Sequence, residues 1–342
     1  MITDRNKNRE IISSYVESRF KSYPKYIRKI LICIVTHLPS RIYFIVKTSV
    51  LYAKDHQYLL KMYYKRPVSN GINQEKRCRK IIISLTTIPS RIEYVPYVLG
   101  SMMRQTLKPD MIILNLGDEL FSNVTLPAVI DKFESAGVTV RYVPDLKPHT
   151  KYYYTLREYP EDIIITIDDD QIYPPNFIEK LYQSYLKHPN AISCYRAHLM
   201  QFDENGDLLS YNKWTKEYSE QINIPSMQLF ATGIGGILYP PHCMHQEVLN
   251  KESLLTLSPI ADDIWLKIMQ VMNNCPVVVI SPFKQLIGVA SSKTQKDALW
   301  RSNVSLNKND IQIQNVLNKY NKYFDDNDTL LRRMNQNLQD IH

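Results

Sequence analysis

Cysteine and glycine are scarce in this chain, which has 5 cysteines and 9 glycines among 342 residues. The cysteines show no Cys-x-x-Cys or Cys/His spacing of the kind that ligates zinc, and their number is odd. This usage is typical of a reducing compartment, where disulfides are rare. We therefore expect a cytoplasmic protein without a disulfide framework.

A secretory signal peptide and a long apolar run are also missing. Residues 1–25 are polar and lack the apolar core of a signal peptide. The apolar stretch 30–53 is interrupted by Pro39, Arg41 and Lys47, whereas a membrane-spanning helix needs about 20 mostly apolar residues. Two short apolar segments between basic residues fit two interpretations equally: a peripheral contact with the membrane surface, or a helical subdomain packed on the main domain. A true membrane span is the least favoured of the three.

Acidic residues are scarce in the first part of the chain. Residues 1–80 contain 18 Lys and Arg against 5 Asp and Glu, a balance of +13, whereas the remainder contains 24 against 29, a balance of −5. The net charge of +8 therefore belongs to an N-terminal extension, which indicates an anionic partner surface. No base-reading motif is recognisable there, so phosphate attraction alone would make nucleic-acid binding non-specific. We expect residues 1–65 to contact an anionic membrane surface, and we expect no sequence-specific binding of nucleic acid.

Regular alternation of strand and helix patterns begins at Lys80, after a linker at residues 66–79 that contains proline, serine and glycine. Strands separated by helices indicate an α/β fold, with a mostly parallel sheet and helices on both faces. We expect a basic helical extension (1–77), an α/β domain (78–300) and a C-terminal helical tail (301–342). The expected strands are 80–86, 111–116, 138–143, 163–167 and 277–280, and the expected helices are 92–105, 127–136, 150–159, 176–187 and 261–273.

Three consecutive aspartates, Asp168, Asp169 and Asp170, directly follow the apolar run 163–167. The β-branched run predicts a fully buried strand, so its carboxylates would stand together at the edge of a sheet. Like charges this close repel and need a compensating cation. A divalent metal that carries a phosphorylated ligand would supply it. The alternative is an acidic helix N-terminus or a solvated turn.

Polar residues also follow the other expected strands. Strand 80–86 ends at Thr86, and Arg91 and Lys151 each lie just past a sheet edge. Ligands of open parallel sheets bind beyond the carboxyl ends of the strands. Arg91 and Lys151 are therefore candidate contacts for a phosphate or a base, although either could equally be a solvated surface cation.

A second acidic pair, Asp262 and Asp263, stands at the start of the expected helix 261–273. Partial burial near Ile264 and Trp265 would raise a carboxyl pKa, and the pair could then supply a general base that deprotonates a hydroxyl group. The alternative is a helix N-cap with an acidic first turn, worth about 1 kcal/mol. Taken together with the aspartate triplet, the pair favours the general base.

Three of the nine glycines fall in FATGIGG, residues 230–236. Glycine lets the backbone approach a ligand closely, and the alternative is a sharp turn between strands. The segment lacks the Lys-Ser/Thr pair of a P-loop, which excludes that class of phosphate site. His242 and His245 follow at a spacing that permits metal ligation, although a pair of surface loop residues is the favoured interpretation.

Four motifs together resemble those of nucleotide-sugar-dependent glycosyltransferases with the GT-A fold: TTIPSR (86–91), the strand with the aspartate triplet, FATGIGG (230–236) and ADDIW (261–265). The resemblance covers about residues 78–300 and is strongest to bacterial family-2-like enzymes, with FATGIGG also similar to fringe-type enzymes. It implies a Rossmann-like GT-A sheet, a nucleoside-diphosphate sugar donor, a glycan or lipid-linked glycan acceptor, and Mn²⁺ or Mg²⁺. It further implies a role in cell-surface polysaccharide or capsule synthesis. Together with the basic residues 1–65, this leads us to expect a cytoplasmic protein with a peripheral contact at the inner face of the cell membrane.

The same resemblance implies roles for individual residues. Asp168 would contact the ribose or nucleotide, and Asp168 and Asp170 would bind the metal. Asp263 would be the base of an inverting transfer. The other residues implied are the nucleotide-sugar contacts Thr86, Arg91, Lys151 and Asp169, the second acid Asp262, and a donor or acceptor loop of Gly235, Gly236 and Trp265.

One departure from the family concerns the metal. Many GT-A enzymes supply a C-terminal histidine as a further ligand, but no histidine occurs here between His245 and His342. Two other functions stay open. A sugar-1-phosphate nucleotidyltransferase would normally have a glycine-rich loop after the first strand, and residues 86–91 have no glycine. A non-enzymatic protein that binds anionic surfaces through residues 1–80 is the third possibility.

Overall fold

The computed structural model describes residues 71–283, 286–289, 308–324 and 328–336, all within the compact unit Pro67–His342. Residues 1–70 of the basic extension, including the apolar stretch 30–53, lie outside the described residues, so the predictions for them stay predictions; residues 71–77 are described and form no helix. Among the helices that the structure describes, none is long and apolar enough to cross a lipid bilayer.

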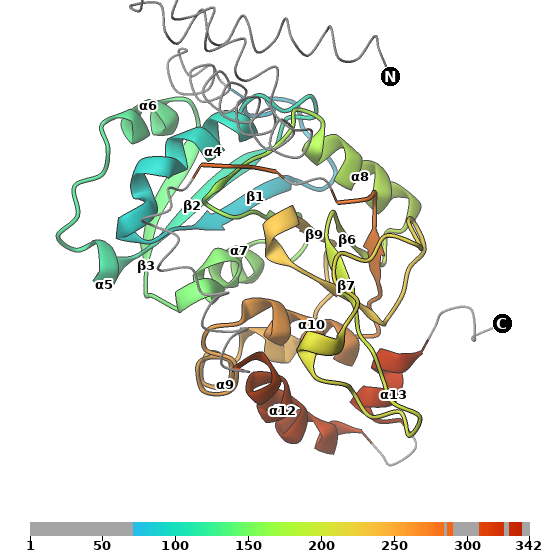
Figure 1. Cartoon of the computed structure of the whole chain (residues 1–342). Coiled ribbons are helices and arrows are strands. Elements are labelled where there is room, and N and C mark those ends of the chain that lie inside the picture. The colour runs from blue at the N-terminus through green and yellow to red at the C-terminus, as the bar shows by residue number, and fades with distance from the viewer. Residues whose placement is uncertain (1–70, 284–285, 290–307, 325–327, 337–342) are drawn as a thin grey trace, which may run out of the picture. The chain divides into compact units, whose positions relative to one another are not determined.

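A seven-stranded sheet forms the centre of the described chain (Figure 1), and its strand order is β10-β6-β9-β4-β1-β2-β3. Neighbouring strands are parallel except on the two sides of β9, which runs antiparallel to β4 and to β6. This confirms the predicted fold class. The strands are β1 (Ile81–Thr86), β2 (Met111–Gly117), β3 (Val138–Val143), β4 (Ile163–Thr166), β6 (Ile192–Cys194), β9 (Ile237–Tyr239) and β10 (Val277–Val279).

Both faces of the sheet are covered, which explains why its central strands are continuous apolar runs rather than alternating ones. In β1, Ile81, Ile82 and Ile83 point alternately to opposite faces and all have 0% exposure. Ile82 shares one core cluster with Ile264 and Ile268 of helix α10. Figure 1 shows α4, α6 and α8 on one side of the sheet and α7, α9 and α10 on the other. These helices are α4 (Val95–Met102), α6 (Val129–Ser135), α7 (Tyr153–Glu158), α8 (Phe177–Lys187), α9 (Lys251–Leu257) and α10 (Asp262–Met272).

Several expected elements are divided in the structure. The helix expected over 92–105 is a 3₁₀ segment, η1 (Pro89–Tyr94), followed by α4, and Pro96 stands in the first turn of α4, where a missing N–H is tolerated. The helix expected over 150–159 likewise divides into η2 (Lys147–Lys151) and α7. Residues 191–197, for which no strand was expected, contribute to two short strands. The remaining short elements are α5 (Asp118–Phe121), β5 (Gln171–Ile172), β7 (Ala197–Leu199), η3 (Tyr211–Lys213), β8 (Leu229–Ala231), η4 (Gly233–Gly235), η5 (Gln246–Leu249), β11 (Ile287–Gly288) and η7 (Asn321–Tyr323).

The glycine-rich segment turns the chain back into the sheet. Gly236 has a φ of +78°, and a Cβ atom there would lie 2.4 Å from the ring of Phe177, so only glycine fits. The turn lets β9 enter antiparallel between β4 and β6. Because Ile237 pairs with Thr166, the loop before β9 lies beside the carboxyl end of β4, where the aspartate triplet begins.

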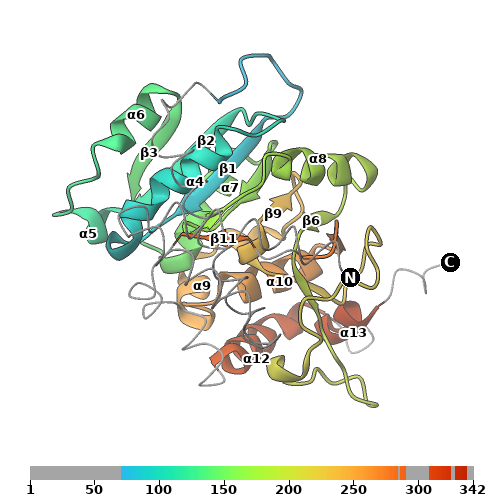
Figure 2. The ribbon, with the colours of Figure 1, turned by 45° about the horizontal axis from the view of Figure 1, so that its top comes forward.

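The C-terminal helices α12 (Lys308–Tyr320) and α13 (Leu330–Asn335) agree with the expected helical tail within the described residues. The Trp265 ring lies edge-on to that of Tyr320, with 5.8 Å between ring centroids. Val316, Leu317 and Tyr320 belong to the same core cluster as α10. The described part of the tail therefore packs as part of the core. Figure 2 shows α12 and α13 next to α10 from a second direction.

Candidate functional site

The aspartate triplet lies where β4 ends, beside the carboxyl end of β1. Ile167 is the last fully buried residue of the run, and the side chains of Asp168, Asp169 and Asp170 are 25%, 9% and 20% exposed. The backbone N–H of Asp168 donates to the hydroxyl of Tyr173 across 2.9 Å, which fixes the turn. The triplet is therefore a partly buried cluster and not a solvated turn.

Asp169 is fixed by two residues of the TTIPSR segment. The Thr87 hydroxyl donates to its Oδ2 across 2.6 Å, and the Arg91 guanidinium donates to its Oδ1 across 3.0 Å. Arg91 also lies 3.5 Å from Asp170. Burial raises the pKa of Asp169, although Arg91 opposes the rise. Burial and the neighbouring aspartates raise the pKa of Asp170 to about 6.

Lys151, at the end of η2, connects the triplet to the second acidic pair. Its ammonium donates to Oδ1 of Asp168 across 2.7 Å and lies 3.5 Å from Oδ2 of Asp262. Burial alone would lower the pKa of Lys151, but the neighbouring carboxylates, Asp168 foremost, together raise it well above its usual value. The ammonium therefore stays charged and forms an ion pair with one carboxylate of each acidic group.

Asp262 and Asp263 form the first turn of α10, and the N-cap residue is Ala261, without a side-chain cap bond. The N-cap half of the alternative is therefore wrong, whereas its acidic first turn is present. Oδ2 of Asp263 accepts a hydrogen bond from the backbone N–H of Gly233 across 3.2 Å. Burial, followed by the charge of Asp262, raises the pKa of Asp263 to about 8.

Gly233 marks the point where these groups meet. A Cβ atom at Gly233 would lie 3.2 Å from Nζ of Lys151, 3.4 Å from Oδ1 of Asp168 and 3.6 Å from Oδ1 of Asp263. The two acidic groups, almost a hundred positions apart in sequence, thus converge on one point. The whole cluster contains five carboxylates and two cations. The carboxylates are those of Asp168, Asp169, Asp170, Asp262 and Asp263, and the cations are Arg91 and Lys151.

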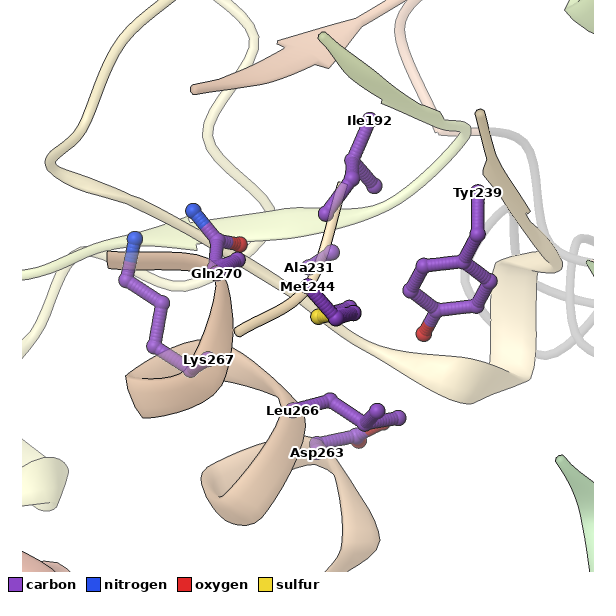
Figure 3. Close-up of a pocket in the computed structure, with 8 residues that line it drawn as sticks. All are labelled: Ile192, Ala231, Tyr239, Met244, Asp263, Leu266, Lys267 and Gln270. Carbon is purple, nitrogen blue, oxygen red and sulfur yellow. The ribbon is translucent and has the colours of Figure 1, made fainter. Parts of the chain in front are cut away.

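A small cavity lies behind Asp263 (Figure 3). It has room for about one water molecule, so it is too small for a nucleotide or a sugar. Figure 3 shows Asp263, Leu266, Lys267 and Gln270 of α10 on one side and Tyr239 of β9 on the other. The Lys267 ammonium does not face a carboxylate: it donates to the backbone carbonyls of Met227 and Leu229, which secures the start of β8.

Other residues predicted for the site have different surroundings. Thr86 donates to the carbonyl of Asn115 in β2, so Thr87 and not Thr86 reaches the triplet. Trp265 has 0% exposure and donates to the Val248 carbonyl, which makes it a core residue without access to a ligand. A Cβ atom at Gly235 would lie 3.0 Å from the Cβ and backbone N of Arg196. Gly235, like Gly236, is therefore required for close packing of the chain.

The histidines have structural partners. His242 pairs with Glu161 across 2.9 Å on an exposed surface, and His245 accepts from the N–H of Glu247. His149 is buried, with one ring nitrogen 2.8 Å from the Tyr152 hydroxyl and the other 2.7 Å from the Ser258 carbonyl. Both its nitrogens are therefore engaged.

The described residues do not fit a metal site built by the protein alone. Oxygens of Asp168 and Asp170, the ligands implied by the family resemblance, already face the cations Lys151 and Arg91. Within the described ranges, no three histidine, cysteine or acidic side chains converge as ligands of one ion.

Sequence reasoning missed three residues that shape this site: Gly233, Thr87 and Tyr173. Gly233 and Thr87 lie inside motifs that the sequence did single out, but nothing in the sequence distinguishes one glycine or one threonine of a motif from its neighbours. No motif in the sequence assigns a role to Tyr173. Its hydroxyl reaches the backbone of Asp168 only because the chain turns after β4.

No family model and no curated protein matches the sequence. Solved structures do match. One is S. aureus TarS in complex with UDP, with 11% sequence identity and a TM-score of 0.41 over 60% of this chain and 59% of that chain. A second is 4-diphosphocytidyl-2C-methyl-D-erythritol synthase, with 12% identity and a TM-score of 0.38 over 65% of this chain and 98% of that chain. A third is CMP:2-keto-3-deoxy-manno-octonic acid synthetase with CTP, with 13% identity and a TM-score of 0.39 over 65% of this chain and 98% of that chain. The match thus spans 59% of the TarS chain. At these TM-scores the matches carry no argument about activity.

Proposed function

We propose that this protein is a glycosyltransferase that moves a sugar from a nucleoside-diphosphate donor to a hydroxyl of a glycan or lipid-linked glycan. One observation supports it above the others: Asp168 and the Asp262–Asp263 pair converge on the Lys151 ammonium and on Gly233. Two separate acidic groups at one sheet edge suit a reaction with two substrates, one of them a hydroxyl that must lose a proton.

The triplet forms the donor side of this site. Thr87 and Arg91 hold Asp169 in place, which leaves Asp168 and Asp170 partly exposed at the edge of the sheet. In the proposal, a carboxylate here accepts hydrogen bonds from the ribose hydroxyls. The Arg91 guanidinium is the cation on this side, and its Nε–H has no acceptor among the described residues.

The acidic pair forms the acceptor side, and Asp263 is its general base. A base works best when its pKa lies near the working pH, and burial has raised the pKa of Asp263 to about 8. The acceptor oxygen would attack the anomeric carbon while the bond from that carbon to the diphosphate oxygen breaks. The hydroxyl proton would pass to Asp263. Attack from the side opposite the leaving group gives inversion.

The proposed cellular role is synthesis of a cell-surface polysaccharide, such as a capsule, at the inner face of the membrane. It follows from the family resemblance and from the basic N-terminal 80 residues, which hold 18 Lys and Arg against 5 Asp and Glu. Binding of the full chain to anionic vesicles, weakened by salt, tests this part separately from catalysis.

A donor screen tests the proposal. UDP-, GDP- and CMP-sugars are each incubated with the full-length protein and a panel of glycan acceptors, with and without Mn²⁺, and nucleotide release is measured. We expect acceptor-dependent release from one donor class and none from Asp263→Asn. Pyrophosphate release from a nucleoside triphosphate and a sugar-1-phosphate would instead identify a nucleotidyltransferase.

A further inference from the structure

Lys151 occupies an unusual place for a phosphate contact. Its ammonium lies between the two acidic groups, 2.7 Å from Asp168 and 3.5 Å from Asp262. Only 13% of its side chain is exposed. A Cβ atom at Gly233 would come within 3.2 Å of Nζ, so the loop before β9 closes a further side. Lys151 therefore faces protein carboxylates and backbone.

The backbone that carries Lys151 is anchored to the sheet. The Ser84 hydroxyl of β1 donates to the Lys151 carbonyl across 2.5 Å and lies 2.7 Å from the Thr155 hydroxyl of α7. Ser84 has 0% exposure, so these bonds do not compete with water. The ammonium thus extends from a fixed point toward the triplet.

The same short element is also anchored to the segment that leads into α10. His149, two positions before Lys151, makes a 2.7 Å hydrogen bond through its Nε2 to the Ser258 carbonyl. The Ser258 hydroxyl in turn donates to the carbonyl of Ala261, the N-cap residue of α10. The segment Lys147–Lys151 is therefore connected to β1 on one side and to the start of the acidic pair on the other.

We propose that Lys151 is a positioning residue that fixes the donor-side triplet against the acceptor-side pair, and that it does not bind the donor diphosphate. The inference rests on the proposed function and assigns Lys151 a different role from the nucleotide contact expected from the sequence. Without the ammonium, the carboxylates of Asp168 and Asp262 repel each other, and their spacing changes.

The consequence for catalysis follows from the geometry of in-line transfer. The acceptor oxygen and the anomeric carbon must meet within about 3–3.5 Å, and a misplacement of about 1 Å can lower the rate about 100-fold. A change at Lys151 should therefore lower kcat. Affinity for the donor should fall less than kcat, because the donor-side groups Arg91 and Asp170 pair with each other and not with Lys151.

Two substitutions at Lys151 separate positioning from phosphate binding. Lys151→Met removes the charge. Lys151→Arg keeps the charge, but it places a bulkier planar group where Gly233 leaves little room. Because arginine binds phosphate at least as well as lysine, a phosphate contact would survive Lys151→Arg, whereas a positioning contact would not. Lys180→Met, at an exposed position of α8, is the matched control.

The experiment measures kcat, donor KM and the donor Kd by calorimetry for the full-length wild type and these variants. We expect kcat to fall about 100-fold in Lys151→Met and about tenfold in Lys151→Arg, with donor Kd within about threefold of wild type in both. Lys180→Met should match wild type. If Lys151→Met fails to fold, Lys151→Arg alone decides between the two roles.

Two results would overturn the inference. The first is a donor Kd that rises tenfold or more in Lys151→Met and returns to the wild-type value in Lys151→Arg. The second is an unchanged kcat in Lys151→Arg, measured beside a folded and active wild type. Neither result would touch the proposed function. If the wild type transfers no sugar from any donor, the proposed function itself fails.

Discussion

The backbone N–H of Gly233 donates to Oδ2 of Asp263 across 3.2 Å. This hydrogen bond connects the loop before β9 to the first turn of α10, so the position of the acidic pair depends on a glycine 30 positions earlier.

Gly233→Ala should disturb the site without disturbing the fold. The added Cβ would lie 3.2 Å from the Lys151 ammonium, which can move by a few tenths of an ångström at the end of its flexible side chain. We expect an unchanged thermal melt and a kcat reduced about tenfold, because in-line transfer depends on position. Gly206→Asn is the control: its Cβ would meet nothing within 4 Å, and asparagine tolerates the φ of +85° at that position. Equal activity of Gly233→Ala and wild type would contradict the described convergence.

The overall α/β arrangement could be predicted from the sequence because strands buried on both faces leave long runs of isoleucine and valine, as in Ile81–Ile83 and Ile163–Ile165. β9 could not be predicted. It has only three residues, Ile237–Tyr239, and its antiparallel direction depends on the left-handed turn at Gly236.

The aspartates of the site could also be predicted, since adjacent carboxylates after an apolar run are unusual. The residues that pair with these aspartates could not be predicted. Neither the bond from Thr87 to Asp169 nor the position of Lys151 between Asp168 and Asp262 depends on sequence spacing. Both result from how separate strands and helices meet. Trp265 was wrongly expected to contact a ligand, because an aromatic residue next to an acidic pair looks the same in sequence whether it faces a ligand or the core.

Asp263→Asn should stabilise the protein above neutral pH. Burial raises the folded-state pKa of Asp263 to about 8, whereas the usual value in an unfolded chain is about 4. The folded state therefore holds the proton more tightly, and the stability from this group is present below about pH 4 and is lost as the pH rises toward 8. Asparagine avoids this loss and still accepts the Gly233 hydrogen bond. We expect Asp263→Asn to exceed wild type by about 1 kcal/mol or more at pH 8, with a smaller difference at pH 5, in urea denaturation. Identical stabilities at both pH values would show that the pKa of Asp263 is not raised in the folded protein.

The same pKa predicts the pH dependence of transfer. The base must be ionised to accept the acceptor proton, so kcat/KM should rise with pH to a midpoint near 8, as burial of Asp263 requires. The measurement is initial-rate kinetics between pH 5.5 and 9.5 at constant ionic strength. A profile that is flat from pH 6 to 9 would exclude Asp263 as the base.

Arg91→Met should destabilise the fold. Its guanidinium is 15% exposed and pairs with Asp169, a carboxylate that is itself 9% exposed. Removal of one partner from a buried pair leaves an uncompensated charge, for which we expect a loss of about 3 kcal/mol in urea denaturation. Arg79→Met is the control, because the carboxylate of Glu161 is 3.9 Å from Arg79 and the hydrogen bond of Arg79 to the Glu161 carbonyl is exposed. It should cost under about 1 kcal/mol. Equal losses in the two variants would mean that Arg91 does not stabilise the triplet.

The protein without nucleotide should bind Mn²⁺ only weakly. Oxygens of Asp168 and Asp170 already face Lys151 and Arg91, and the described residues hold no cluster of three ligands. Equilibrium dialysis should therefore show no stoichiometric uptake at micromolar Mn²⁺. One equivalent bound under those conditions would reveal a metal site that the described residues do not form.

Donor binding and transfer, measured side by side on Asp263→Asn and Asp168→Ala, test most directly whether the two acidic groups serve two substrates. We predict that Asp263→Asn binds the donor like wild type in calorimetry but transfers less than about 1% as fast, as expected for the loss of a general base. Asp168→Ala should lose donor binding. Transfer by Asp263→Asn at the wild-type rate, or a parallel loss of donor binding in both variants, would contradict the division of the site into a donor side and an acceptor side.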